Sequence, residues 1–82
     1  MYVLRTEELG EYWGGTFTIE QKEFVITAKE LVDYLLENGY VEIPDSVEMT
    51  FEGEVYEIDT FDVLKGKRSE IMRFYREVED IL

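Results

Sequence analysis

The chain has 82 residues, with 20 acidic residues against 8 basic residues, so its formal net charge is −12. This length predicts one small domain, and contents of 45% hydrophobic and 15% aromatic residues exclude an intrinsically disordered acidic tail. The chain contains no cysteine and no histidine, which excludes disulfide bonds, thiolate metal sites and imidazole catalysis.

The charge also limits which partners the chain can bind. An excess of negative charge repels nucleic acid and anionic membranes and attracts basic proteins. No apolar run approaches the roughly 20 residues of a membrane span. The N-terminal segment 1–8 is too short and too acidic for a signal peptide. We therefore expect a cytoplasmic protein that binds neither a membrane nor nucleic acid directly.

Strands are predicted near the N-terminus. Residues 2–4 alternate between apolar and other side chains, which indicates a short strand. Residues 16–27 contain two apolar, β-branched runs. They predict either two strands joined by a turn at Gln21 and Lys22 or one longer strand with a bulge. The glycine-containing stretch 10–15 is the longest candidate for irregular structure.

Residues 28–38 carry the clearest helical pattern. Thr27 and Glu30 match the two ends of a capping box. Apolar side chains then recur at helical spacing, and Gly39 after Asn38 supplies a C-terminal stop.

A β-hairpin is predicted on either side of Gly53, where apolar and acidic residues alternate. Parity restricts its register, because a shift by one residue would mix the two faces. An even loop of two or four residues keeps the apolar side chains together, as the pairs Met49–Tyr56 and Val47–Ile58.

A second helix is predicted at the C-terminus. Apolar residues from Ile71 to Leu82 recur at helical intervals, and the helix begins between Asp62 and Ser69. The element order is thus β-β-α-β-β-α. We expect one acidic α+β domain over residues 1–82, with a mostly antiparallel sheet and two helices packed on one face of it.

The predicted hairpin carries a dense acidic face. Glu48, Glu57 and Asp59 are expected on one side, with Glu52 and Glu54 near the tip. Alternate side chains of a strand lie roughly 6.6–6.8 Å apart, comparable with the spacing of neighbouring phosphates. The expected register places Glu48 opposite Glu57, which costs stability and favours a functional role. The alternative is a solvated face that keeps the protein soluble by charge.

A second candidate site is the pair Tyr12 and Trp13, which lies among glycines and includes the only tryptophan. Tryptophan and tyrosine are enriched at binding hot spots. The alternative is that Trp13 folds back to cap the core. The predicted partner-binding residues are therefore Glu48, Glu52, Glu54, Glu57, Asp59, Trp13 and Tyr12.

The C-terminal segment is locally basic, through Lys65, Lys67, Arg68, Arg73 and Arg76. We expect these residues to pair with carboxylates of the same chain, as in Arg73 with Glu77 and Arg76 with Asp80. The alternative is contact with phosphate or with a second, acidic surface.

Catalysis has little support in the sequence. Without cysteine and histidine, no Ser-His or Cys-His nucleophile pair can form. Lys65-Gly66-Lys67 lacks the first glycine of a phosphate-binding loop, and no segment has the spacing of a calcium loop. We expect no enzyme, no cofactor and no metal, although a carboxylate-bound divalent metal enzyme remains a third hypothesis.

The leading hypothesis is a non-enzymatic module whose acidic hairpin face docks on a basic, nucleic-acid-handling protein. In size and charge the chain resembles phage or mobile-element inhibitors that mimic nucleic acid, of the anti-restriction and anti-CRISPR kinds, and this resemblance is one of composition without a motif. The alternative is a structural, oligomerising subunit, for example a homodimer. It would use an apolar helix edge near Tyr34 or Met72.

Overall fold

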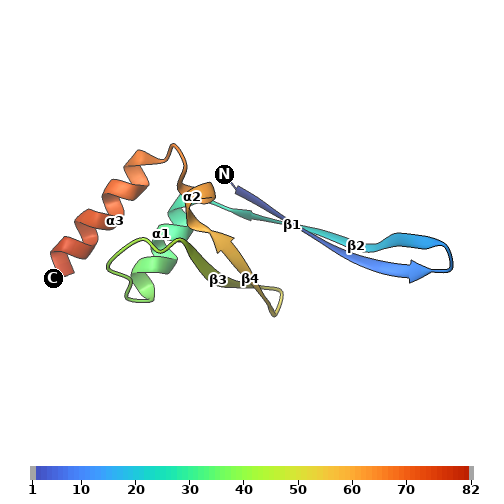
Figure 1. Ribbon diagram of the computed structural model, residues 1–82. Helices are drawn as coiled ribbons and strands as arrows, with labels where there is room; N and C mark the ends of the chain where they lie inside the picture. Colours follow the sequence, from blue (N-terminus) through green and yellow to red (C-terminus); the bar gives the residue numbers. More distant parts are fainter. Residues whose placement is uncertain (1, 82) are drawn as a thin grey trace.

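The computed structural model describes residues 2–81, and the side chains of all of these except residues 6–9, 12 and 17–20. The elements in chain order are β1 (Tyr2–Tyr12), β2 (Gly15–Ile26), α1 (Ala28–Glu37), β3 (Ser46–Phe51), β4 (Glu54–Asp59), α2 (Thr60–Leu64) and α3 (Arg68–Ile81). Figure 1 shows a small body built from α1 to α3 and β3–β4, from which the hairpin of β1 and β2 projects. The predicted α+β class is confirmed.

The packing of the strands differs from the prediction. Within residues 2–81 the strands form two separate antiparallel sheets of two strands each, β1–β2 and β3–β4. The expected single sheet with two helices on one face is therefore wrong. A short additional helix, α2, also precedes α3. It begins directly after β4, where the Asp59 side chain accepts a hydrogen bond from the backbone N–H of Asp62 at 3.1 Å.

The β1–β2 hairpin, called the arm below, is much longer than predicted. Its pairing runs from Tyr2 opposite Ile26 to Tyr12 opposite Gly15, with one irregularity between Glu8 and Leu9. For residues 16–27, the expected alternative of one longer strand with a bulge is thus confirmed. The expected irregular stretch 10–15 is wrong, because only residues 13–14 lie between the strands. Gly14 has a φ of +97°, which permits a turn this tight.

Among the described side chains of the arm, apolar residues at its root pack on the body. Ile26 is fully buried, Tyr2 and Leu4 contact the core, and the ring of Phe24 stacks on Phe51 with centroids 4.9 Å apart. Beyond this root the arm runs away from the body (Figure 1). The radius of gyration of 16.3 Å accordingly exceeds the roughly 12 Å of a compact chain of this length.

Local signals of the sequence fix α1 and the β3–β4 hairpin. The Thr27 hydroxyl accepts a hydrogen bond from the backbone N–H of Glu30 at 3.1 Å, as the capping box predicts. The predicted hairpin register is confirmed at every pair from Ser46–Asp59 to Phe51–Glu54. Of the two even loops, the two-residue loop is present. Glu52 and Gly53 have φ values of 50° and 81°, the positive values that a type I′ turn requires.

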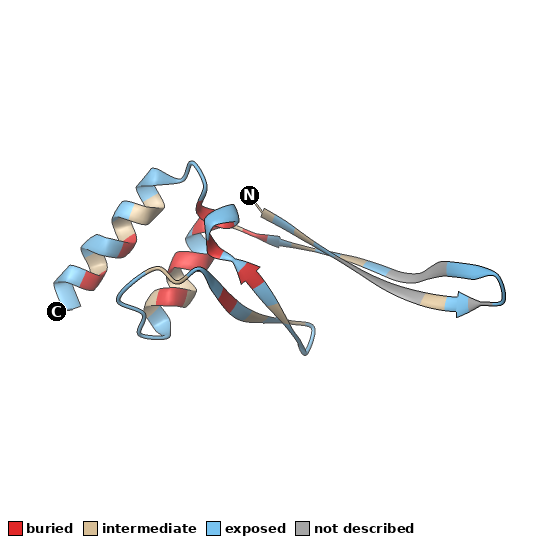
Figure 2. Ribbon diagram, viewed as in Figure 1, coloured by how far each residue is buried: buried red, intermediate tan, exposed pale blue. Residues whose placement is uncertain are grey.

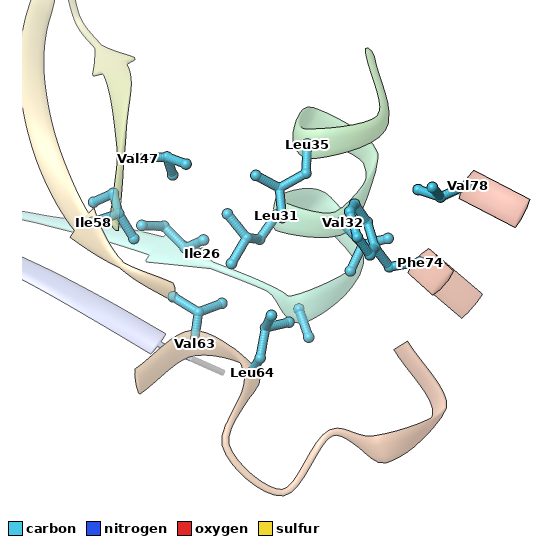
Figure 3. Close-up of a cluster of buried hydrophobic side chains, with 11 residues drawn as sticks. Ile26, Leu31, Val32, Leu35, Val47, Ile58, Val63, Leu64, Phe74 and Val78 are labelled. Carbon is cyan, nitrogen blue, oxygen red and sulfur yellow. The ribbon is translucent and has the colours of Figure 1, made fainter. Parts of the chain in front are cut away.

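The core gathers around α1. Leu31, Val32 and Leu35 of this helix are fully buried. Figure 2 shows that burial is concentrated in the body, and Figure 3 shows side chains from the other elements converging on the helix. The contributing residues outside α1 are Ile26, Val47, Ile58, Val63, Leu64, Phe74 and Val78.

One cation joins α3 to α1. The Arg73 guanidinium contacts carboxylates of Glu70 at 2.8 Å, Glu77 at 3.0 Å and Asp33 at 3.0 Å, and donates to the Lys29 carbonyl oxygen at 3.4 Å. The Arg73–Glu77 pair is one of those predicted from the sequence. The side chain of Arg73 is only 22% exposed, so this network is better shielded from water than an ordinary surface pair.

The substitution Arg73→Ala should lower the free energy of unfolding by about 1–3 kcal/mol, because three carboxylates lose their common partner. Urea denaturation followed by circular dichroism measures this change. Arg76→Ala is the matched control: Arg76 lies on the same helix, is exposed, and has no ion pair within residues 2–81. The control should change stability by less than about 0.5 kcal/mol. Equal losses in the two variants would contradict the role given to Arg73.

The same network makes stability depend on acid pH. The hydrogen bond from Lys29 is the largest cause that holds the pKa of Asp33 below its ordinary value of 3.8, with burial opposing and Arg73 adding to the effect. Because folding lowers this pKa, the carboxylate stabilises the fold above the pKa of the unfolded chain. This stabilisation is lost as the pH falls through the pKa of the folded chain.

Asp33→Asn should therefore be less stable than the parent at neutral pH, by up to about 1 kcal/mol for such a part-exposed group. The difference should shrink toward zero as the pH falls through the lowered pKa of Asp33, because the parent carboxylate is then neutral as well. Thermal melts at a series of pH values test this expectation. A difference in stability that stays constant down to the lowest pH would contradict it.

Candidate protein-binding surfaces

The acidic pair, Glu48 and Glu57, lies where the sequence predicts it. The two residues face each other across β3 and β4, and both are exposed. With Tyr34 and Tyr40 they line an open, mostly polar hollow. The Tyr34 hydroxyl donates a hydrogen bond to the backbone carbonyl oxygen of Glu48 at 2.6 Å, so α1 holds this part of β3 in place.

The other three hairpin carboxylates have partners within the chain. Glu52 forms an ion pair with Lys22 of the arm at 3.0 Å. Glu54 lies on the same side of β4 as Tyr56, and it accepts a hydrogen bond from the hydroxyl of that residue at 2.8 Å. The third carboxylate, that of Asp59 at the end of β4, caps the N-terminus of α2. The five predicted carboxylates therefore do not form one surface, and the outward-facing acidic surface centres on the acidic pair.

Trp13 lies at the tip of the arm and is 100% exposed. The alternative expectation, that it folds back to cap the core, is therefore wrong. The side chain of Tyr12 lies outside the described residues. Figure 1 places the tip far from β3–β4, at the opposite end of the molecule from α3. The aromatic and the acidic parts of the predicted site are thus two separate surfaces.

A third surface, called the α2–α3 groove below, shares only Asp59 with the predicted site. It is an open groove of about 420 Å³, lined by Ile43, Pro44, Asp45, Asp59, Thr60, Phe61, Leu64, Ile71 and Tyr75. Phe61 is 68% exposed and Tyr75 is 49% exposed. Sequence reasoning missed the groove because it did not predict α2. The helical start signal of Asp59, three residues before Asp62, could have located that helix.

The basic residues divide into two sets. Arg73 pairs with acidic residues of its own chain, as expected. Within residues 2–81, no ion pair involves the basic segment Lys65, Lys67 and Arg68 or joins Arg76 to Asp80, so the expectation of internal pairing is wrong for these residues. The basic segment directly follows Leu64 of the groove and connects α2 to the first residue of α3.

The described part of the chain has neither a metal-binding cluster nor a membrane-spanning helix. It contains no cluster of three or more acidic side chains placed to hold a metal ion. Its helices are all too short or too polar to cross a membrane. Comparison with protein-family models, with curated proteins and with solved structures found no match to this chain.

Glu57→Gln should raise the free energy of unfolding by about 0.2–1 kcal/mol, because it removes a like charge directly opposite Glu48. Chemical denaturation of the variant measures this gain. Glu42→Gln is the matched control, since Glu42 is exposed, lies outside the helices and strands, and loses the same charge. A gain of equal size in the control would show that net charge, and not the opposed pair, is responsible.

Proposed function

We propose that this protein is a non-enzymatic binding module that docks its acidic pair on a basic protein. The observation that carries the proposal is the direct opposition of Glu48 and Glu57 on an exposed strand pair that α1 holds in place. Two like charges in this position destabilise the free protein. A cationic side chain of a partner would neutralise this repulsion. The repulsion would then destabilise only the free protein, and its relief would favour the complex.

The overall charge supports the same proposal. A net charge of −12 on a chain of 82 residues produces a strong negative potential around the molecule. Such a potential speeds encounter with a positively charged protein and makes the association rate fall as salt rises. A cytoplasmic location is part of this proposal.

The proposed partner is a protein that handles nucleic acid, and the proposed mechanism is competition for its basic groove. Glu52 and Glu54 lie at the tip of the hairpin and Asp59 lies at its base, and each has a partner within the chain. The ion pair of Glu52 is exposed at the surface, and such pairs contribute only about 0–1 kcal/mol. A groove lined with arginine and lysine can compete for such a carboxylate and widen the acidic contact. The protein would then act as an inhibitor of the nucleic-acid-mimicking kind.

The arm tip is not part of this acidic contact. Trp13 stands away from the hairpin, so one flat surface of a partner would not reach both sites without following the length of the arm (Figure 1). The proposal therefore assigns partner binding to β3–β4 and leaves Trp13 and Tyr12 for a separate role.

The experiment that tests the proposal compares two double variants with equal changes of charge. Glu48→Lys with Glu57→Lys reverses the acidic pair, and Glu37→Lys with Glu42→Lys reverses two exposed charges elsewhere. Tagged proteins are used to capture partners from native extract, with identification by mass spectrometry and with circular dichroism as a check of folding.

We expect basic, nucleic-acid-handling proteins to be captured by the parent and by the control variant. The acidic-pair variant should lose them, and added duplex DNA or RNA should displace them from the parent. Capture of the same partners by a folded acidic-pair variant would overturn the proposal. Equal loss in both double variants would show that only net charge matters, which would also overturn it.

A further inference from the structure

The distal part of the arm has exposed side chains. A two-stranded hairpin by itself is only marginally stable, and the described apolar side chains of this one that pack on the body lie at its root, next to the ion pair of Lys22 with Glu52. Beyond the root, the described side chains Glu11, Trp13, Thr16 and Gln21 are all exposed. A fully exposed tryptophan at the tip of such an arm is typical of a residue that becomes buried in an interface.

The α2–α3 groove is shaped to receive an apolar side chain. The buried side chain of Thr60 fixes one wall, because its hydroxyl donates to the carbonyl oxygen of Pro44. The backbone N–H of Thr60 also donates to the carbonyl oxygen of Asp45 at 3.1 Å. Leu64 and Ile71 contribute apolar surface from the two helices. The volume of about 420 Å³ lies within the roughly 300–1,000 Å³ of binding pockets in general.

The charges of the arm and of the basic segment beside the groove are complementary, whereas the groove itself is lined by two carboxylates, Asp45 and Asp59. The arm, residues 2–26, has five glutamates and two basic residues, and its distal segment 7–16 has three glutamates and no basic residue. The basic segment beside the groove contains Lys65, Lys67 and Arg68 and no acidic residue. Since these three cations have no ion pair within residues 2–81, an acidic segment would not have to displace existing partners.

We propose that the arm of one copy docks its tip in the α2–α3 groove of a second copy. Trp13 enters the groove against Phe61 and Tyr75, and the glutamates of the distal arm lie along the basic segment of the receiving copy. The groove of the same copy is out of reach, because the arm is a paired ribbon that leads away from the body (Figure 1). The inference goes beyond the proposed function and does not depend on the acidic pair.

In a reciprocal arrangement, the groove of each copy would receive the arm tip of the other. If each arm enters the groove of its partner, the two contacts are identical and the assembly closes as a twofold dimer. Each contact would bury one tryptophan, a residue that contributes roughly 150–250 Å² of buried surface by itself. The acidic pair stays outside these contacts, so a dimer would carry two exposed copies of it.

The single tryptophan makes the proposal directly testable. Sedimentation measures the mass of the assembly as concentration rises to the millimolar range in physiological salt, while fluorescence reports the surroundings of Trp13. We expect a monomer–dimer equilibrium, with tryptophan emission that moves to shorter wavelength as the dimer forms. A protein that stays monomeric throughout, or a dimer whose tryptophan emission does not shift, would overturn the proposal and leave the groove to a different partner.

Matched variants locate the contact. Trp13→Ala and Phe61→Ser should each weaken the dimer about tenfold or more, because each removes one side of every contact. Val55→Ser is the apolar control, since Val55 is 61% exposed and lies outside the groove. Lys67→Glu should also weaken the dimer, whereas Arg76→Glu, with the same change of charge, should weaken it less. Equal effects of a variant and its control would overturn the proposed docking site.

Mixing two defective variants gives the sharpest test. The Trp13→Ala chain contains no tryptophan but keeps its groove, while the Phe61→Ser chain keeps its arm tip. When they are mixed, all tryptophan emission comes from the Phe61→Ser chain, and it should shift as its arm enters the intact groove. No shift on mixing would contradict exchange between copies, whatever the two variants do separately.

Discussion

The packing of α1 is the constraint on which the whole molecule depends. Leu31, Val32 and Leu35 are fully buried, and the core around them takes side chains from all the other helices and strands of the described chain. A chain of 82 residues with a net charge of −12 can spare few residues for burial. The charged side chains therefore stay at the surface, and the hydrophobic effect of this small core must offset their mutual repulsion. The groove and the outward acidic pair are both surfaces of elements that α1 holds in place.

What could be predicted from the sequence was local. The capping box at Thr27 and the parity of the hairpin around Gly53 each depend on residues close together in the chain, and both predictions are confirmed. The arm could not be predicted in the same way. Gly10 inside β1 indicates a loop, and only the pairing with β2 places it in a strand. The expected single sheet was wrong because periodicity predicts strands but does not show which hairpins pair with each other.

In the candidate site too, local features could be predicted and long-range contacts could not. The opposition of Glu48 and Glu57 followed from the period of a strand and is present. The ion pair between Glu52 and Lys22 joins residues thirty positions apart, and no local pattern indicates it. Asp59 is different, because its position before a helix is a local signal that favours capping over binding. Carboxylates that look alike in a sequence thus differ in what the fold leaves them free to do.

The division between body and arm has a consequence for how this protein can change over generations. A substitution at Trp13 removes no contact from the core, since that side chain is wholly exposed. Mutations there escape the stability threshold that restricts the body. Selection can therefore rework the tip to suit a new surface while the rest of the sequence stays the same. The arm lets recognition diversify without putting folding at risk.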